Sequence, residues 1–170
     1  MILDDFIVLN KTGLFCSYGD FYLDPKEIVK NAVISHAHGD HAIGGNLNVF
    51  CTEATALFMK HRYRKFAGNE FHIKAYHEVF DLNGVRISLI PAGHILGSAQ
   101  VLMEYKGVKY LYTGDYKLQP DKTCEPIEFV EADVLITETT FADPGTQHPV
   151  AEEEILKLNG TQTNIMLGAY

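Results

Sequence analysis

Four potential metal ligands are packed into six consecutive positions at the end of a short apolar segment. The segment AVISH ends in His36, and His38, Asp40 and His41 follow it, shortly before a pair of glycines. A buried structural histidine needs one partner and one pocket, whereas three histidines beside an aspartate indicate something held from several directions. Zinc prefers imidazole and carboxylate ligands at about 2.0–2.2 Å, and hydrolytic zinc sites keep one position open for water. The chain is therefore predicted to fold so that a strand delivers this loop to a metal site.

The spacing of these residues favours two ions over one. A loop leaving a strand can direct His36 and His38 at one ion, while Asp40 and His41 face a second. The alternative is a structural role, in which the histidines hydrogen-bond to backbone carbonyls. That alternative leaves the dense spacing of four potential ligands unexplained.

Two further ligand candidates follow apolar runs later in the chain. His94 lies in PAGHILGSAQ, after a predicted strand, and Asp115 lies in the glycine turn of YLYTGDY. Either residue alone is a weak candidate, since loop histidines and turn aspartates usually face solvent. Beside the first cluster, His94 is expected to complete the first ion and Asp115 to bridge the two. The glycines around them are expected to let a phosphate come close.

Two other acidic residues stand at strand ends. Asp24 in FYLDP is expected to accept a hydrogen bond from a ligating histidine, and the alternative is a turn aspartate before proline. Glu138 in ITETTF ends a strand that looks buried, where an unpaired carboxylate is costly. A partner at the metal site is therefore expected for Glu138.

Apolar runs separated by turn residues predict short strands with interspersed helices, that is, an α/β (α+β) chain. The first helix is expected to have Thr52 as its N-cap and Gly68 just past its end, and a hairpin is expected to turn at Lys106-Gly107. Helices are predicted over residues 53–66 and 149–158. Strands are predicted over residues 2–9, 12–19, 21–25, 32–36, 84–93, 100–105, 108–114, 131–139 and 163–170.

Composition indicates an ordinary globular protein with one sizeable core, at 46% hydrophobic and 21% charged residues. No apolar run approaches the ~18 residues of a membrane span, and Asp4 and Asp5 stand where a secretory signal would carry basic residues. No membrane contact and a cytoplasmic location are therefore predicted. Cys16, Cys51 and Cys124 form neither a disulfide framework nor a zinc-ribbon pattern.

The net charge of −8 taken alone argues against a nucleic-acid partner. Metal ions change that balance, because two divalent ions would add four positive charges at the site. The segment KHRYRK also concentrates basic residues on the first predicted helix, and the alternative for it is a solvated helix face. The candidate contacts with a nucleic-acid backbone are Lys60, Arg62, Arg64 and Lys65.

The order of Asp24, the 36–41 cluster, His94 and Asp115 resembles the metallo-β-lactamase fold superfamily. GHILGSA around His94, TGD at Asp115 and ETTF at Glu138 are similar to its β-CASP branch, the nucleases of RNA 3′-end processing and DNA repair. Within that branch the chain looks most like the bacterial DNA-ligase-associated exonucleases, which also resemble mRNA 3′-end processing factors. The similarity runs from about Asp24 to the closing MLGAY.

The resemblance implies an αββα sandwich, of which this chain is expected to hold the N-terminal half and the start of a β-CASP segment. Residues 1–140 would be the N-terminal part of the metallo-β-lactamase domain, and residues 141–170 the truncated start of the β-CASP segment. The family places a further histidine on the second ion after the β-CASP insertion, and His148 has no counterpart in that pattern. A half sandwich would expose an apolar face, so self-association is also expected.

The function that the resemblance implies is an exonuclease-like phosphodiesterase acting on DNA or RNA. Two divalent ions, Zn²⁺ or else Mn²⁺, would activate a hydroxide, with Asp40, Asp24 and Glu138 as the catalytic carboxylates. Nucleic acid is the expected partner, and a DNA ligase or a helicase is a further candidate. The alternatives are a hydrolase of small thioesters, lactones or lactams on the same fold, and a non-catalytic binding module. The 170 residues by themselves are expected to be a poor catalyst.

Overall fold

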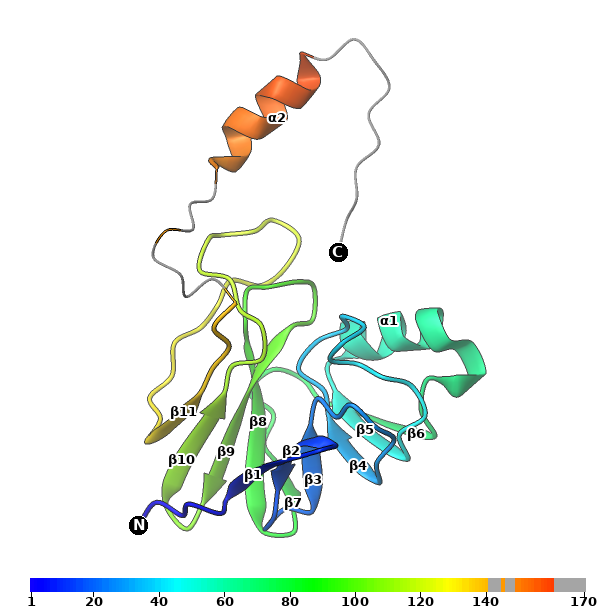
Figure 1. Ribbon diagram of the computed structural model, residues 1–170, viewed down its shortest axis with the longest axis vertical. Helices are drawn as coiled ribbons and strands as arrows, with labels where there is room; N and C mark the ends of the chain where they lie inside the picture. The colour runs from blue at the N-terminus through cyan, green and yellow to red at the C-terminus, as the bar shows by residue number, and fades with distance from the viewer. Residues whose placement is uncertain (141–144, 146–148, 161–170) are drawn as a thin grey trace. The chain divides into compact units, whose positions relative to one another are not determined.

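The computed structural model describes residues 1–140, 145 and 149–160 (Figure 1). The chain divides into two units, Met1–Glu138 and Thr139–Tyr170. The first unit contains two mixed β-sheets and one α-helix, and the described part of the second contains α2 (Ala151–Asn159). The predicted α/β class is confirmed. Assignment of the two units to a metallo-β-lactamase part and a β-CASP segment stays a prediction.

The first sheet has six strands in sequence order. Strands β1 to β3 are antiparallel, and β3 to β6 are parallel. Parallel pairing from β3 onward brings the ends of β3 and β4, which precede Asp24 and His36, to the same edge of the sheet. The strands are β1 (Ile7–Asn10), β2 (Gly13–Cys16), β3 (Phe21–Leu23), β4 (Asn31–Val33), β5 (Asn48–Cys51) and β6 (Glu70–Ile73).

The second sheet has the order β11-β10-β9-β8-β7, and only its β10–β11 pair is parallel. The predicted hairpin is confirmed, because Tyr105 pairs with Val108 across Lys106-Gly107. Both turn residues have positive φ, 50° and 76°, which suits the twist of a two-residue hairpin. The strands are β7 (Phe80–Leu82), β8 (Val85–Pro91), β9 (Ala99–Tyr105), β10 (Val108–Tyr112) and β11 (Val134–Ile136).

The two sheets bury one shared core between them. Strand residues of the first sheet, such as Phe21 and Leu23, and of the second, such as Leu89 and Met103, are at most 1% exposed and belong to the same cluster. The inner faces therefore cover one another within residues 1–138, and the bare inner face expected from the sequence is absent there. The two mixed sheets with few helices are consistent with the expected partial sandwich, but both of its layers are present and cover the apolar face that was expected to be bare. Self-association stays a prediction without that argument.

Helix α1 (Glu53–Tyr63) covers the outer face of the first sheet through Ala56 and Met59 (Figure 1). The N-cap prediction is confirmed, since the Thr52 hydroxyl accepts from the Thr55 backbone N–H. The predicted end at residue 66 is wrong. Arg64 has a φ of 55°, which stops the α-helix, and a short 3-10 turn takes its place over Arg64–Phe66.

The strands in the structure differ from those predicted from the sequence mainly where they are short. β5, β6 and β7 were not predicted, because strands of three or four residues carry little alternation of their own. β11 is shorter than predicted and is not buried: it lies at the sheet edge, and Leu135 is 61% exposed. The predicted strand over 163–170 lies outside the described residues, as does His148. Within the described part of the chain, no helix is long and apolar enough to cross a bilayer.

Candidate metal centre

Three imidazoles and one carboxylate from three loops converge on a single point. The His38 Nδ1 atom lies 3.0 Å from His36 Nε2 and 3.1 Å from His94 Nε2. Asp115 Oδ2 lies 3.7 Å from His36 Nε2 and 3.6 Å from His94 Nε2. All four ligand atoms fall within 4.8 Å of one another. Nitrogens that share one tetrahedral zinc ion at about 2.0–2.1 Å are roughly 3.3 Å apart, so this set fits one ion.

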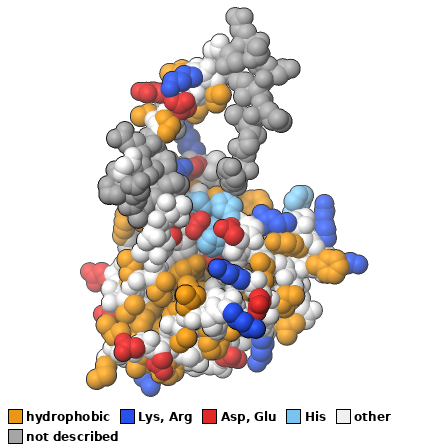
Figure 2. Space-filling view, viewed as in Figure 1, with side chains coloured by type: hydrophobic (Ala, Val, Ile, Leu, Met, Phe, Trp, Pro, Cys, Tyr) orange, Lys and Arg blue, Asp and Glu red, His pale blue; other side chains and the backbone are white. Residues whose placement is uncertain are grey.

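Backbone contacts join the loops that carry these ligands. The Ala99 N–H donates to the Ser35 carbonyl at 2.8 Å, which ties the start of β9 to the residue before His36. The Ser98 hydroxyl accepts from the His94 N–H at 3.0 Å and so closes the His94 loop. The Ala42 N–H donates to the His38 carbonyl at 2.8 Å. Figure 2 shows the resulting group of histidines beside carboxylates on one face of the first unit.

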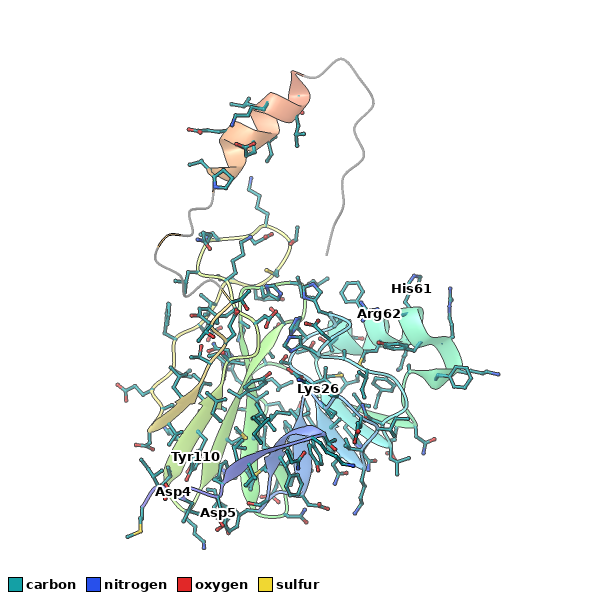
Figure 3. The ribbon with its side chains drawn as sticks, in the orientation of Figure 1. Asp4, Asp5, Lys26, His61, Arg62 and Tyr110 are labelled. Atoms are coloured by element: carbon teal, nitrogen blue, oxygen red, sulfur yellow. The ribbon has the colours of Figure 1, made fainter. Side chains whose placement is uncertain are left out.

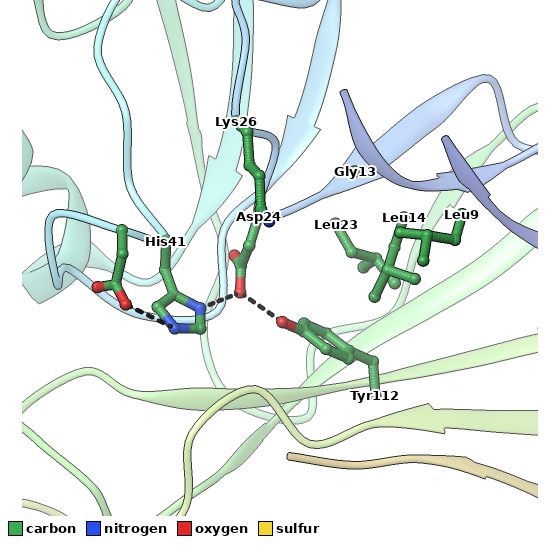
Figure 4. Close-up of a pocket in the computed structure, with 9 residues that line it drawn as sticks. Leu9, Gly13, Leu14, Leu23, Asp24, Lys26, His41 and Tyr112 are labelled. Carbon is green, nitrogen blue, oxygen red and sulfur yellow. Dashed lines mark hydrogen bonds and ion pairs between the residues drawn. The ribbon is translucent and has the colours of Figure 1, made fainter. Parts of the chain in front are cut away.

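A second set of groups surrounds His41. Its Nε2 atom lies 3.3 Å from Asp115 Oδ1 and 3.7 Å from Asp40 Oδ2, while its Nδ1 lies 2.9 Å from Asp24 Oδ2 (Figure 4). The two oxygens of Asp115 thus face the two sets, which suits a bridging carboxylate. Asp40 is 83% exposed at its side chain and remains open to solvent. Asp24, His36 and His41 also lie close enough to form a ligand group.

Hydrogen bonds to Asp24 decide against it as a ligand. Ser35 donates to it twice, from its backbone N–H at 2.7 Å and from its hydroxyl at 2.5 Å. His41 Nδ1 and the Tyr112 hydroxyl each donate at 2.9 Å. Both carboxylate oxygens of this buried side chain are therefore occupied, so Asp24 orients His41 and leaves its Nε2 to face Asp40 and Asp115.

Ser35 also determines the tautomer of His36. The single hydroxyl proton of Ser35 is donated to Asp24, so the same oxygen accepts from His36 Nδ1 at 3.0 Å. His36 therefore carries its proton on Nδ1 and presents an unprotonated Nε2 to the cluster. Ser35 and Tyr112 were missed in the sequence, where the only signal was that Tyr112 stands three residues before Asp115.

The pKa values of the histidines separate into two groups. Burial, followed by the charge of His41, lowers the pKa of His36 to about 4, and burial also lowers that of His94. For His41 burial acts downward, but hydrogen bonds with Asp115 and Asp24 outweigh it and raise the pKa to about 10. The hydrogen bond with His41 lowers the pKa of Asp115 to about 2. His36 is thus neutral near pH 7, while His41 is an imidazolium held between carboxylates.

Metal binding at the His41 set is expected to release a proton. An ion can bind His41 Nε2 only after its proton leaves, and the raised pKa keeps that proton in place up to pH about 10. Below that pH the affinity of the His41 set rises with pH, and about one proton is released at pH 7.5. Calorimetric titration of Zn²⁺ in buffers of different ionisation enthalpy measures this number. Zero release for every bound ion would show that His41 Nε2 is not a ligand.

The other site residues predicted from the sequence have different surroundings. Glu138 Oε1 accepts from the Tyr116 backbone N–H at 3.3 Å and lies beside the Asp115 turn. Among the basic residues, Arg62 Nη1 donates to the Ala37 carbonyl at 2.5 Å, between His36 and His38. The structure therefore gives Arg62 a contact with the ligand loop, and Figure 3 labels it on α1.

Lys60 and Lys65 lie instead over aromatic rings, Phe71 at 4.7 Å and Phe66 at 5.1 Å. Arg64 takes the left-handed backbone conformation that ends α1. The four basic residues therefore do not converge on the ligand cluster, and their contacts with nucleic acid stay a prediction.

Protein packing explains Gly114 better than the close approach of a phosphate. A Cβ at Gly114 would lie 2.7 Å from the Ser35 Cβ and Oγ atoms, and its φ is 54°. Gly114→Ala is therefore expected to displace Ser35 from Asp24 and His36, at a cost of about 1–3 kcal/mol in the free energy of unfolding. Urea unfolding with metal and with chelator measures it. Gly107→Ala is the control, because Gly107 has positive φ but open space around it, so this change measures backbone strain without a clash. If both variants lose the same free energy of unfolding, the displacement of Ser35 is contradicted.

Comparisons with known proteins find relatives that share part of this sequence. No family model matches the chain. A probable DNA ligase from Opitutus terrae is 36% identical over 134 residues, which cover 78% of this chain and 13% of the ligase. Endoribonuclease YSH1 from Candida glabrata is 30% identical over 161 residues, covering 73% of this chain and 20% of that protein. The Neurospora crassa endoribonuclease ysh-1 is 30% identical, covering 82% and 20%.

The chain thus spans about a fifth or less of the length of these relatives. This chain carries a cluster of histidines and aspartates whose geometry fits metal ions. The chain is therefore a distant homologue, over this segment, of the β-CASP nucleases represented by the YSH1 endoribonucleases and of a DNA-ligase-linked protein, and it carries a metal site of the metallo-β-lactamase type.

Proposed function

We propose that this protein is a metal-dependent phosphodiesterase that hydrolyses DNA or RNA. The observation that carries the proposal is the division of the ligands into two sets that share Asp115, one oxygen facing each set. Such an arrangement suits the two-ion sites of phosphodiester hydrolysis, and the relatives named as endoribonucleases act on phosphodiesters.

Each residue of the site has a distinct task in this proposal. Zn²⁺ or Mn²⁺ ions, when bound, would lower the pKa of water and stabilise negative charge on phosphoryl oxygens. His36, His38 and His94 would hold the first ion, and His41 with Asp40 the second. Asp24 would keep the His41 ring oriented, since it accepts the Nδ1 proton at 2.9 Å. Glu138, beside the Asp115 turn, would support that loop and help manage protons.

RNA is the first substrate to test, because the YSH1 relatives are endoribonucleases. DNA comes second, because a homologous segment belongs to a probable DNA ligase. A DNA ligase, or a helicase, is accordingly proposed as a partner. An exonuclease-like mode of cleavage is also proposed, as is the division into a metallo-β-lactamase part and a β-CASP segment.

Oligonucleotide hydrolysis tests the proposal. The protein is incubated with 5′-labelled single-stranded RNA and DNA in Zn²⁺, in Mn²⁺ and in chelator, and the products are separated by length. Asp40→Ala is expected to abolish cleavage without unfolding the protein, because Asp40 is exposed. Asp4→Ala, another exposed aspartate on the chain, serves as the control.

A small-molecule hydrolase is the second candidate function. Aliphatic side chains line a cavity next to His41, and such a wall also suits the acyl part of a thioester or lactone. Metal-dependent turnover of thioesters with none of any oligonucleotide would replace the nuclease by this candidate. Metal binding without any turnover would favour a non-catalytic binding module.

A further inference from the structure

A cavity of about 420 Å³ adjoins the His41 side of the metal centre (Figure 4). Ligand-binding cavities are typically about 300–1,000 Å³, so this one has room for one small organic group. Asp24, Asp40 and His41 line one side and Tyr112 lies nearby, which makes the cavity continuous with the proposed reaction site. The remaining lining residues are Leu9, Gly13, Leu14, Leu23 and Lys26.

The wall opposite the metal ligands is aliphatic. Leu9 on β1, Leu14 on β2 and Leu23 on β3 form it, and the close-up shows the three together, away from the carboxylates. Leu9 is 76% exposed although it lies on a strand. A large side chain exposed at the rim of a cavity is available to pack against a bound group.

Hydrogen bonds hold this wall in place. The hairpin between β1 and β2 is closed by the Asn10 side chain, which accepts from Thr12 N–H at 2.9 Å. The Thr12 carbonyl accepts from the Lys26 N–H at 2.8 Å, and the Thr12 hydroxyl donates to Glu27 at 2.9 Å. The hairpin is therefore tied to the segment that follows Asp24, and the cavity exists before a ligand binds.

Lys26 adds a cation to the rim. Its side chain is exposed, and among the residues that the structure describes it has no ion-pair partner. It lines the same cavity as His41 and is labelled in Figure 3. A ligand that uses the whole cavity therefore needs an apolar part for the leucines and an anionic part for Lys26.

We propose that this cavity binds the nucleoside next to the phosphate that is cleaved. This inference rests on the proposed function, and it assigns substrate contacts to Leu9, Leu14 and Lys26. The base packs on the leucines, and the phosphate on its far side contacts the Lys26 ammonium. Because aliphatic side chains have no hydrogen-bonding groups with which to read base edges, the leucine wall does not select between bases.

Cleavage kinetics with oligouridylate and oligoadenylate octamers test the assignment. Leu9→Ser is expected to raise KM roughly threefold to tenfold on both octamers through lost apolar burial. Lys26→Ala is expected to raise KM and to reduce the slope of log affinity against log salt by about 0.7, the value for one phosphate contact on a single strand. The kcat and the metal content are expected to stay unchanged in both variants. A structural defect would instead lower kcat or the metal content as well. The salt series is measured as binding in the Asp40→Ala background, where no cleavage occurs.

Matched controls lie on the same elements. Val8→Ser changes the neighbour of Leu9 on β1 that does not line the cavity, and Lys30→Ala removes an exposed lysine elsewhere. If wild-type protein cleaves the octamers and the cavity variants match their controls, the cavity is not a substrate site and the proposed function stands. If wild-type protein cleaves neither these octamers nor their deoxyribonucleotide counterparts, the proposed function itself fails. If Leu9→Ser raises KM for thioesters but not for the octamers, the assignment of the cavity to a nucleoside is overturned.

Discussion

His38→Ala is expected to remove the ion of the first set and to lower any hydrolytic activity by more than roughly 100-fold. His38 is the central ligand, because its Nδ1 lies within 3.1 Å of nitrogens on both His36 and His94. Changes to the outer partners of metal ligands already cost about 10–100-fold, and loss of a ligand should cost more. The measurement is metal content by mass spectrometry after purification without chelator. Thermal unfolding with and without chelator accompanies it.

His38 is a better choice than His36 for this test, because His36 is fully buried and its loss would also perturb the core. His61→Ala is the matched control, an exposed histidine on α1 (Figure 3). Chelator should lower the melting temperature of wild-type and His61→Ala protein but have a smaller effect on His38→Ala. Full metal content in His38→Ala would show that the converging imidazoles are not a metal site.

Asp24→Ala is expected to destabilise the protein by about 3–5 kcal/mol, the usual cost of removing one member of a buried charged pair. The substitution leaves four donors from Ser35, His41 and Tyr112 without their acceptor. Asp24 also has a φ of 42°, a conformation that alanine rarely adopts. Urea unfolding measures the loss, and metal titration should show weaker binding at the His41 set.

Asp24→Asn separates the loss of the carboxylate charge from the backbone strain that alanine would suffer at this positive φ. Asparagine tolerates positive φ, and its amide oxygen can still accept from the Ser35 N–H. The amide nitrogen then takes the place of Oδ2 and cannot accept from either His41 or Tyr112. This variant should recover part of the stability without recovering the metal affinity of the His41 set. Asp4→Ala, an exposed turn aspartate, should change neither quantity. Equal metal affinity in Asp24→Asn and wild-type protein would mean that the carboxylate does not orient His41.

Local patterns in the sequence were enough for several features. The Lys106-Gly107 turn, the Thr52 cap and the strand over Val85–Pro91 each depend on residues adjacent in sequence, so short-range preferences predicted them. The dense spacing of residues 36–41 also led to His94 and Asp115 as expected further ligands; the structure brings both close to His36 and His38, and metal binding by them stays a prediction. Where a preference was weak, as in the short strands β5 to β7, prediction failed because pairing with neighbouring strands supplies their stability.

The sequence by itself determined which side chains could form a metal site, because ligand type and spacing are properties of the chain. Only the tertiary structure decided how they are used. Asp24 and Tyr112 come from different sheets and meet only because the sheets pack face to face. That contact helps to occupy the Asp24 carboxylate. The same carboxylate accepts from His41 Nδ1, which directs His41 Nε2 at Asp40 and Asp115. The hydrogen bond from Arg62 on α1 to the ligand loop likewise depends on a contact between distant segments, as does the leucine wall beside Lys26. No local pattern encodes such contacts.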